Sequence, residues 1–132
     1  MPGRIDPSIS EAESQVMELL WRSAPQGSEE LVAALQPETS WHENTVRTLL
    51  NRLIQKGAVR AEREGRRYLY SPVLTREQWQ SHESRSLLDR VFGGKVAPLL
   101  VHFSRNEKLS ARDVAELRKL VDQIEKKGRR HD

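Results

Sequence analysis

Residues 41–73, WHENTVRTLLNRLIQKGAVRAEREGRRYLYSPV, contain the clearest structural signal in this chain. In the first half, residues 41–56, apolar side chains recur at the i, i+3, i+4, i+7 spacing of a helix with one buried face. Gly57 directly follows, and a glycine at this place is typical of a left-handed helix cap. We therefore predict a helix whose narrow apolar stripe consists of Val46, Leu49, Leu50 and Leu53.

The opposite face of this predicted helix is polar. Its side chains are short or planar hydrogen-bonding groups, the kind that reach base edges and phosphates in the major groove of DNA. Such a face on a helix with a buried apolar stripe favours contact with a nucleic acid. The side chains are Asn44, Thr45, Arg47, Thr48, Asn51 and Arg52.

Two short β-runs, residues 58–63 and 67–73, follow the helix. The turn between them contains Gly65, where a tight hairpin needs a positive φ. A polar-faced helix followed by a basic hairpin is the outline of a winged helix–turn–helix reader of DNA. The predicted fold class is therefore mainly α, with a small β-hairpin as the wing.

Two arginines, Arg66 and Arg67, lie at the tip of the predicted hairpin. At this position they can contact phosphates or the minor groove. The alternative is that they stabilise the turn by pairing with Glu62 and Glu64, and both roles can hold together.

The positive charge of the chain is concentrated in the same stretch. The formal net charge is +3, but between His42 and Tyr70 seven basic residues face three acidic ones. This stretch therefore carries +4, while the rest of the chain sums to −1. Neutralisation of DNA phosphates requires such a distribution. A merely solvated basic face is the alternative.

Composition sets further limits. A chain of 132 residues is one domain, or a small domain with an appendage, and with 36% hydrophobic and 5% aromatic residues its core is modest. Such a chain often completes its core by associating with a second copy. The absence of cysteine excludes disulfides, thiolate catalysis and cysteine-based sensing. No apolar run reaches membrane-spanning length, and the start MPGRIDPS lacks a signal-peptide core, so we expect a cytoplasmic protein without membrane insertion.

Upstream of the central stretch we expect a loose arm and two helices. Residues 1–9 are predicted to be loose, with a phosphate contact by Arg4 as the alternative. A capping box formed by Ser10 and Glu13 starts a helix that ends near Ser23. Within that helix we expect Ala12, Val16, Leu19 and Leu20 to be apolar contacts, and Trp21 is either a core or an interface residue.

A short second helix is predicted to begin after Pro25-Gln26-Gly27, with Ser28 as its cap and two glutamates in its first turn. After a turn at residues 37–40, the polar-faced helix would complete a helix–turn–helix. The inward face of the short helix should consist of Leu31, part of Val32, Ala34 and Leu35.

The C-terminal part is expected to form helices that cannot bury their own apolar faces. We predict helices over residues 76–92, with Thr75 as the cap, over residues 95–103, and from a Ser110 capping box through Ile124. We interpret residues 75–132 as a dimerisation domain and residues 1–74 as the winged-helix domain. The alternative is that the C-terminal helices fold back on the winged helix in a monomer. The tail KKGRRHD is expected to be disordered and to add non-specific DNA affinity. The apolar residues that would form the dimer contact are Leu87, Leu88, Val91, Leu100, Phe103, Val114, Leu117, Val121 and Ile124.

No catalytic or metal site is predicted. The histidines, His42, His82, His102 and His131, lack paired metal-ligand spacing and are interpreted as isolated surface residues. Phosphate-binding glycine loops and nucleophile motifs are absent. The carboxylates of the N-terminal helices are interpreted as caps or solvated groups. We therefore expect a non-enzyme that needs no cofactor and no metal.

Taken together, these motifs resemble the penicillinase repressor family (BlaI/MecI/CopY) of winged-helix transcriptional regulators, over nearly all of residues 9–124. The similarity lies in SEAE at 10–13, NTVRTLLNRL at 44–53 followed by Lys56-Gly57, GRRYLYSP at 65–72, and FGG at 92–94. The resemblance implies a homodimeric repressor, of the antibiotic-resistance type, on inverted-repeat operators of the TACA/TGTA kind. It implies base reading by Thr45, Arg47 and Thr48. It also implies backbone contacts by Asn44, Asn51, Arg52, Arg66 and Arg67.

The resemblance also suggests how such a repressor is released. In the β-lactam branch a membrane metalloprotease sensor triggers cleavage in the dimerisation arm, and the matching bond here would be His102-Phe103. Loss of the last helix would then weaken the binding of two half-sites as one. The copper branch uses a cysteine-rich motif that this chain lacks. From a different class, the alternative function is a winged-helix module that binds a protein without sequence-specific DNA binding.

Overall fold

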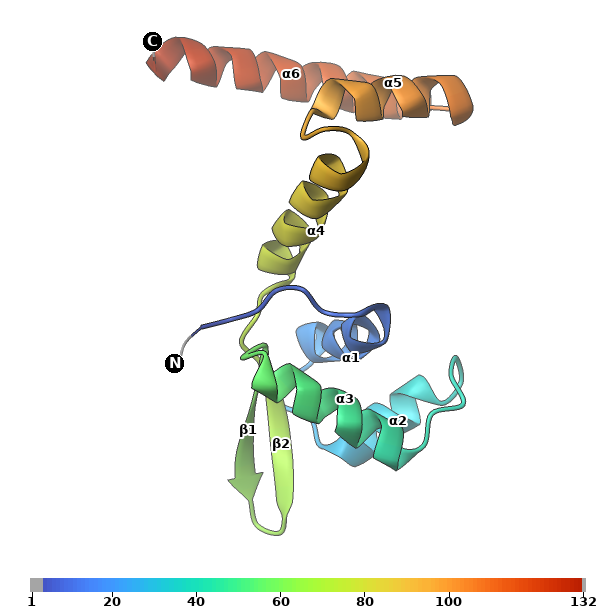
Figure 1. The fold of residues 1–132 in the computed structure, drawn as a ribbon, viewed down its shortest axis with the longest axis vertical. Coiled ribbons are helices and arrows are strands. Elements are labelled where there is room, and N and C mark those ends of the chain that lie inside the picture. Colours follow the sequence, from blue (N-terminus) through green and yellow to red (C-terminus); the bar gives the residue numbers. More distant parts are fainter. Residues whose placement is uncertain (1–3, 132) are drawn as a thin grey trace. The chain divides into compact units, whose positions relative to one another are not determined.

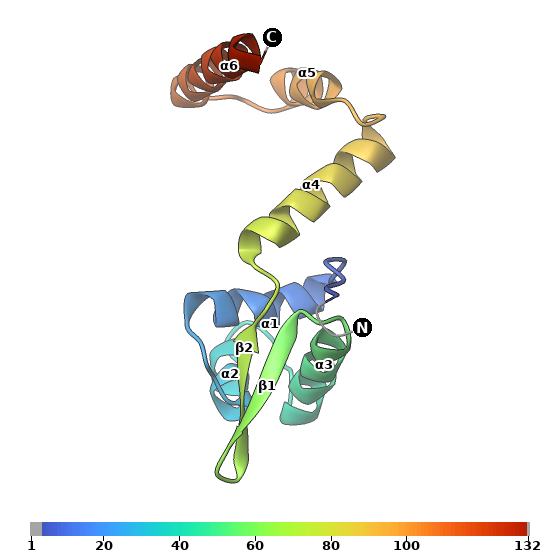
Figure 2. The ribbon, with the colours of Figure 1, turned by 90° about the vertical axis from the view of Figure 1, so that its left-hand side faces the viewer.

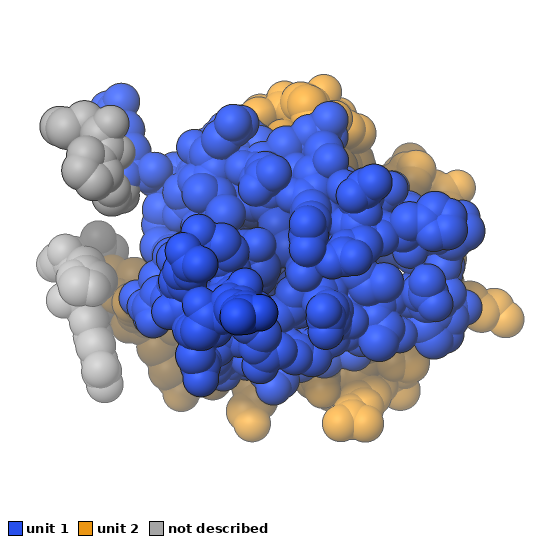
Figure 3. Space-filling model, turned by 90° about the horizontal axis from the view of Figure 1, so that it is seen from below, with its two compact units in different colours: residues 1–85 blue, residues 86–132 orange. Residues whose placement is uncertain are grey.

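The structure, a computed structural model, describes residues 4–131, with side chains up to residue 128. This part of the chain is mainly helical with one antiparallel hairpin, as predicted (Figure 1). It forms two compact units, residues 1–85 and 86–132, which Figure 3 distinguishes by colour. The division falls inside the fourth helix, and the expected domain boundary after residue 74 remains a prediction. The elements are α1 (Glu11–Arg22), α2 (Ser28–Leu35), α3 (Glu43–Gln55), β1 (Val59–Glu64), β2 (Arg67–Pro72), α4 (Arg76–Val91), α5 (Val96–Asn106) and α6 (Ala111–His131).

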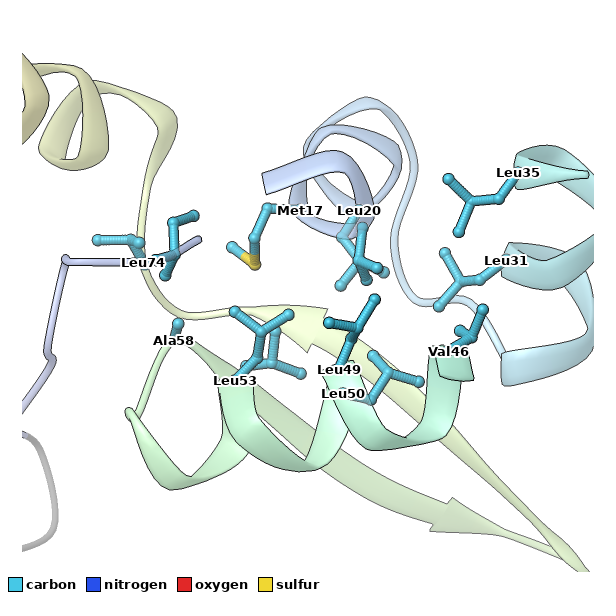
Figure 4. Close-up of a cluster of buried hydrophobic side chains, with 13 residues drawn as sticks. Met17, Leu20, Leu31, Leu35, Val46, Leu49, Leu50, Leu53, Ala58 and Leu74 are labelled. Atoms are coloured by element: carbon cyan, nitrogen blue, oxygen red, sulfur yellow. The ribbon is translucent and has the colours of Figure 1, made fainter. Parts of the chain in front are cut away.

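Helix α3 supplies the centre of the core in the first unit. Its predicted apolar stripe is buried, and Figure 4 shows these side chains facing those of α1 and α2. Removing these apolar surfaces from water is the main force that holds the three helices together. The buried hydrophobic residues are Ile9, Val16, Met17, Leu20, Leu31, Leu35, Val46, Leu49, Leu50, Leu53, Ala58, Val59 and Leu74.

Helix α1 begins at the predicted capping box. The Ser10 hydroxyl accepts a hydrogen bond from the Glu13 N–H at 3.0 Å, and the Glu13 carboxylate accepts one from the Ser10 N–H at 2.7 Å. Glu13 therefore caps the helix as predicted, but its side chain is also buried and pairs with Lys56 Nζ at 2.7 Å, which the sequence did not predict. Ala12 and Leu19 are only half-buried, and Met17 takes the core position.

Helix α2 starts and faces slightly differently from the prediction. Its N-cap is Gly27, one residue before Ser28, and the Gly27 N–H donates to the Glu30 carboxylate. Ala34 is exposed rather than inward-facing, because Leu31 and Leu35, one turn apart, already fill the core side. Helix α3 likewise begins at Glu43, two residues later than expected.

The N-terminal segment is not the loose arm that we expected. Ile9 is buried, Ile5 packs against the core, and the Asp6 N–H donates to the Lys56 carbonyl at 2.8 Å. These contacts fasten the segment to the C-terminal end of α3. The predicted arm also included residues 1–3, which lie outside the described residues.

Strands β1 and β2 form the predicted hairpin with a two-residue loop, Gly65-Arg66 (Figure 2). Gly65 has φ +65°, whereas Arg66 has no positive φ, which is the pattern of a type II′ turn. At the other end the Tyr70 backbone exchanges hydrogen bonds of 2.8 and 3.1 Å with that of Gln26. The wing is therefore joined to the loop between α1 and α2.

The structure decides between the two roles considered for Trp21 and shows the predicted cap at Thr75. Trp21 packs against the core: its indole N–H donates to the Leu74 carbonyl at 2.8 Å, and its ring lies 5.5 Å from that of Trp79. Thr75 caps α4 as predicted, since its hydroxyl accepts from the Gln78 N–H at 3.0 Å.

The second unit is helical and has no buried core of its own among the described side chains. No side chain between residues 75 and 128 is buried. Gly93 and Gly94 adopt positive φ angles of +59° and +79° and separate α4 from α5, as predicted. Helix α6 is longer than predicted, because it continues past Ile124 to His131, so the expectation of a disordered tail is wrong as far as that residue.

Candidate nucleic-acid interface

The outward face of α3 carries the six polar side chains that the sequence singled out, and all of them are exposed. Arg47 pairs with Glu43 one turn earlier, at 2.8 Å, and its side chain remains 60% exposed. The Thr48 hydroxyl donates to the Asn44 carbonyl at 2.9 Å, which leaves its lone pairs free to accept. An exposed face of this kind can present both donors and acceptors to base edges.

A groove of about 310 Å³ lies where the start of α2, the start of α3 and the wing meet. It brings Arg47, predicted to read bases, together with Arg66 and Arg67, predicted to contact the backbone. Sequence reasoning missed the half-exposed Tyr68, whose alternation with Tyr70 along β2 was the available signal. The groove, which we call the wing groove, is lined by Gly27, Ser28, Glu29, Arg47, Arg66, Arg67, Tyr68 and Tyr70.

The two arginines at the wing differ in their surroundings. Arg67 pairs with Glu30 of α2 at 2.5 Å, and this carboxylate raises the pKa of the guanidinium. The Gly27 N–H and Arg67 together lower the pKa of the Glu30 carboxyl. The partner is thus Glu30, rather than the turn glutamates considered from sequence. Arg66 forms no ion pair with any described residue, so its charge is available to a ligand.

Lys56 does not belong to the polar surface. Its ammonium group donates to the Glu13 carboxylate at 2.7 Å and to the Ser8 carbonyl at 2.9 Å. One of the seven basic groups counted in the sequence is therefore used inside the protein. Within residues 42–70, the other six basic side chains are all exposed arginines.

The nine predicted dimerisation residues lie on α4, α5 and α6 and are at most half-buried. Seven have exposed fractions between 39% and 59%, and Leu88 and Leu117 are intermediate. The predicted cleavage bond, His102-Phe103, lies within α5, where the Phe103 carbonyl accepts from the Glu107 N–H at 2.9 Å. The predicted dimerisation residues are therefore exposed or only partly buried in the single chain.

Within the described residues, histidine and carboxylate side chains form no group of three or more that could hold a metal ion. Nor does any helix in that part of the chain combine the length and apolarity needed to cross a membrane.

The fold and the exposed polar helix beside a basic wing define a winged helix–turn–helix protein. Over residues 9–123 the sequence matches the family described as penicillinase repressor. The chain belongs to the penicillinase repressor family.

Individual relatives agree with this assignment. The chain is 31% identical over 117 residues to the penicillinase repressor of Bacillus licheniformis, covering 89% of this chain and 91% of the relative. It is 25% identical over 114 residues to the methicillin resistance regulatory protein MecI of Staphylococcus aureus, covering 86% and 93% of the two chains. The solution structure of the DNA binding domain of the repressor BlaI matches with a TM-score of 0.52 at 33% identity, covering 57% of this chain and 92% of that one.

Proposed function

We propose that this protein is a cytoplasmic, homodimeric transcriptional repressor of the β-lactam-resistance type, which binds inverted-repeat operator DNA and acts without catalytic residues or a cofactor. The observation that carries the proposal is the division of α3 into one buried apolar face and one exposed polar face. Names of the relatives, which include a penicillinase repressor and a methicillin resistance regulator, support it.

In this proposal α3 enters the major groove with Thr45, Arg47 and Thr48 as the base-reading residues. An arginine can bind the O6 and N7 atoms of guanine with two hydrogen bonds, and a threonine can contact either a polar base edge or a thymine methyl group. The pair with Glu43 holds Arg47 near its place before DNA arrives. Because that pair is exposed, little free energy is lost when the guanidinium turns to a base.

The flanking side chains would hold the DNA backbone. We propose phosphate contacts by Asn44, Asn51 and Arg52 on α3, and by Arg66 and Arg67 on the wing. Arg66 is free to do so at once, whereas Arg67 would bridge a phosphate and Glu30 or exchange one for the other. The wing groove places both arginines beside Arg47.

Two copies would be joined through the exposed apolar faces of α4, α5 and α6. An exposed apolar seam along one side of a helix is what a partner helix covers in a dimer. Val114, Leu117, Val121 and Ile124 are spaced by three and four residues along α6 and fit such a seam. A dimer that binds two half-sites at once has a higher affinity for the operator than a single copy has for one half-site.

Release from DNA is proposed to follow cleavage of the His102-Phe103 bond under the control of a membrane sensor metalloprotease. Cutting there would separate α6 from the winged helix and weaken the pairing of the two copies. A variant at Phe103 that resists cutting should then keep the operator occupied when the inducer is present. Derepression that proceeds unchanged in a strain unable to cut the protein would argue against this route.

Operator binding tests the central part of the proposal. Footprinting on the chain's own promoter should give a protected inverted repeat, and Arg47→Ala or Thr48→Ala should each weaken it by about 1–3 kcal/mol. Arg22→Ala, on the exposed end of α1, is the matched control and should bind as the parent does. If both α3 variants also bind as the parent does, the base-reading assignment is wrong. An affinity that does not change with salt concentration would instead favour a protein partner for α3, since phosphate contacts weaken steeply as salt rises.

A further inference from the structure

The N-terminal segment is built onto the C-terminal end of α3 by close backbone contacts. Gly57 has φ +76°, and a Cβ atom there would lie 2.5 Å from the Arg4 carbonyl oxygen, so only glycine lets the segment approach this closely. The neighbouring Asp6 N–H donates to the Lys56 carbonyl. Ile5, which lies between Arg4 and Asp6, packs against the core. Arg4 is therefore held at a defined place beside the helix.

Next to this junction lies a shallow hollow of about 300 Å³, which we call the arm hollow. Its two guanidinium groups, of Arg4 and Arg52, form no ion pair with described residues. The ammonium group of Lys56 is already bonded to Glu13 and Ser8. The one carboxylate, of Asp6, accepts hydrogen bonds from the N–H and hydroxyl of Ser8 at 3.0 and 2.5 Å. The full lining is Arg4, Ile5, Asp6, Arg52, Gln55 and Lys56.

We propose that the arm hollow is a second phosphate site, in which Arg4 and Arg52 bind one DNA backbone phosphate at the end of α3 opposite the wing groove. This inference rests on the proposed function and adds Arg4 to the DNA-binding surface. Guanidinium groups suit the task, because each can donate two parallel hydrogen bonds to phosphate oxygens.

The dimensions of α3 support two separate anchor points. A helix of 13 residues is about 20 Å long, whereas the major groove is about 12 Å wide. When the first turns of α3 lie in the groove, its last turn reaches a phosphate wall. The wing groove lies at the Arg47 end of the helix and the arm hollow at the Arg52–Lys56 end, so each end has its own arginines.

Pre-positioning distinguishes Arg4 from an arginine on a frayed terminus. A side chain on a disordered arm loses backbone and rotamer freedom when it binds, and this loss offsets the contact. Here the Arg4 carbonyl already lies against Gly57 and the next residue, Ile5, packs on the core, so less backbone freedom is lost when the side chain binds.

The test measures the salt dependence of DNA affinity for the full-length chain, with any tag at its C-terminus. The probes are a duplex with an inverted TACA/TGTA repeat and a random duplex of equal length. Arg4→Gln should reduce the slope of log affinity against log salt by about 0.9 for each protomer, and so by about 2 for a dimer. Arg4→Lys keeps the charge and should retain most of the slope.

The matched control is Arg22→Gln, which removes the same charge from the end of α1, beside Glu18 and Glu38. Its slope should equal that of the parent. The unfolding midpoint of each variant, followed by tryptophan fluorescence, should also be unchanged, because Arg4 and Arg22 are both exposed.

The outcomes separate the two proposals. A parent protein that does not bind DNA in a salt-dependent manner overturns the proposed function itself. A parent that binds, together with an Arg4→Gln variant whose slope equals that of Arg22→Gln, overturns the arm hollow alone. Loss of affinity at constant slope also overturns it, because removal of a phosphate contact must change the slope. If Arg4→Gln proves unstable, the salt slope of Arg4→Lys serves as the test instead. A slope about 2 lower than that of the parent would contradict the proposed phosphate site, because lysine keeps the charge.

Discussion

The two units of this chain differ in where their apolar side chains lie. In residues 4–85 thirteen hydrophobic side chains are buried, and the exposed positions of α3 other than Ile54 are polar. In residues 86–128 no side chain is buried, although α5 and α6 are strongly amphipathic. The first unit has the core of an independent domain, whereas the second exposes the faces that a core would need. The proposed dimer would account for this difference, because a second copy would cover the exposed apolar faces of the second unit.

Tryptophan fluorescence provides a probe of the first unit alone. All three tryptophans, Trp21, Trp41 and Trp79, belong to residues 1–85. Their fluorescence therefore follows unfolding of the first unit, while the far-ultraviolet circular dichroism of the helices reports on both.

The largest effect is expected from a cavity in the core of the first unit. Leu50→Ala removes a fully buried side chain at the centre of α3 and should lower the free energy of unfolding by about 2–5 kcal/mol. Urea unfolding followed by tryptophan fluorescence measures this loss. Ile54→Ala, on the same helix but 38% exposed, is the control and should cost far less. Equal losses for both variants would contradict the core described here.

A slightly smaller effect, on association rather than folding, is expected from the second unit. Val121→Asp and Ile124→Asp place a charge on residues that are 50% and 59% exposed in the single chain. If a partner chain covers this face, each substitution should weaken dimerisation by about 3 kcal/mol, because the carboxylate would be buried without a partner. Sedimentation equilibrium gives the dissociation constant.

Gln123→Asp adds the same charge between these two residues and serves as the control. It should leave the dissociation constant nearly unchanged, since the neighbouring position points to another side of the helix. The tryptophan-detected unfolding midpoint should be the same for all three variants. A midpoint that falls with the loss of the dimer would mean that the two units do not fold independently.

The smallest expected effect is on the pH dependence of stability, and it again concerns the first unit and not the second. Burial alone would raise the pKa of the Glu13 carboxyl, but the hydrogen bonds from Lys56 and Ser10 outweigh it, so its pKa is lowered on folding. A lowered pKa gives stability that is present at neutral pH and is lost as the pH falls below the usual range of a glutamate. Lys56→Gln should therefore cost about 1–3 kcal/mol at pH 7 and less at pH 3.

Lys119→Gln, on exposed α6, is the matched control and should not alter the free energy of unfolding at either pH. The measurement is tryptophan-detected urea unfolding between pH 3 and pH 7. A loss at Lys56 that stays constant over this range would show that the contact is not electrostatic.

Much of the first unit could be predicted from the sequence because its signals are local. The spacing of Val46, Leu49, Leu50 and Leu53 predicts the buried face of α3. The polar residues of the helix must then lie on the opposite, exposed face. Capping boxes at Ser10 and Ser110 give two helix starts, and Gly65 gives the turn of the wing. Each of these depends on residues within one or two turns of one another.

Apart from small shifts at the ends and faces of α2 and α3, the errors mostly concern contacts between distant segments. The pairs Glu13–Lys56 and Glu30–Arg67 join residues that are 43 and 37 positions apart, and no local spacing reports them. The docking of Ile5 and Ile9 depends on a core that only the folded helices create. The end of α6 lies further along the chain than predicted for a different reason. A basic segment can continue a helix without any apolar contact, because lysine and arginine have favourable helix propensities.

The position of the His102-Phe103 bond has a consequence for the timing of any cut made there. The bond belongs to an α-helix, and the carbonyl of Phe103 is engaged with the next turn. A protease that acts on opened chain segments would cut at a rate set by how often this helix unwinds. A partner chain packed over Leu100 and Phe103 would make unwinding rarer, so an unpaired copy would be cut first. Each cut copy would then leave the pool of possible partners, and the remaining dimers would dissociate to replace it.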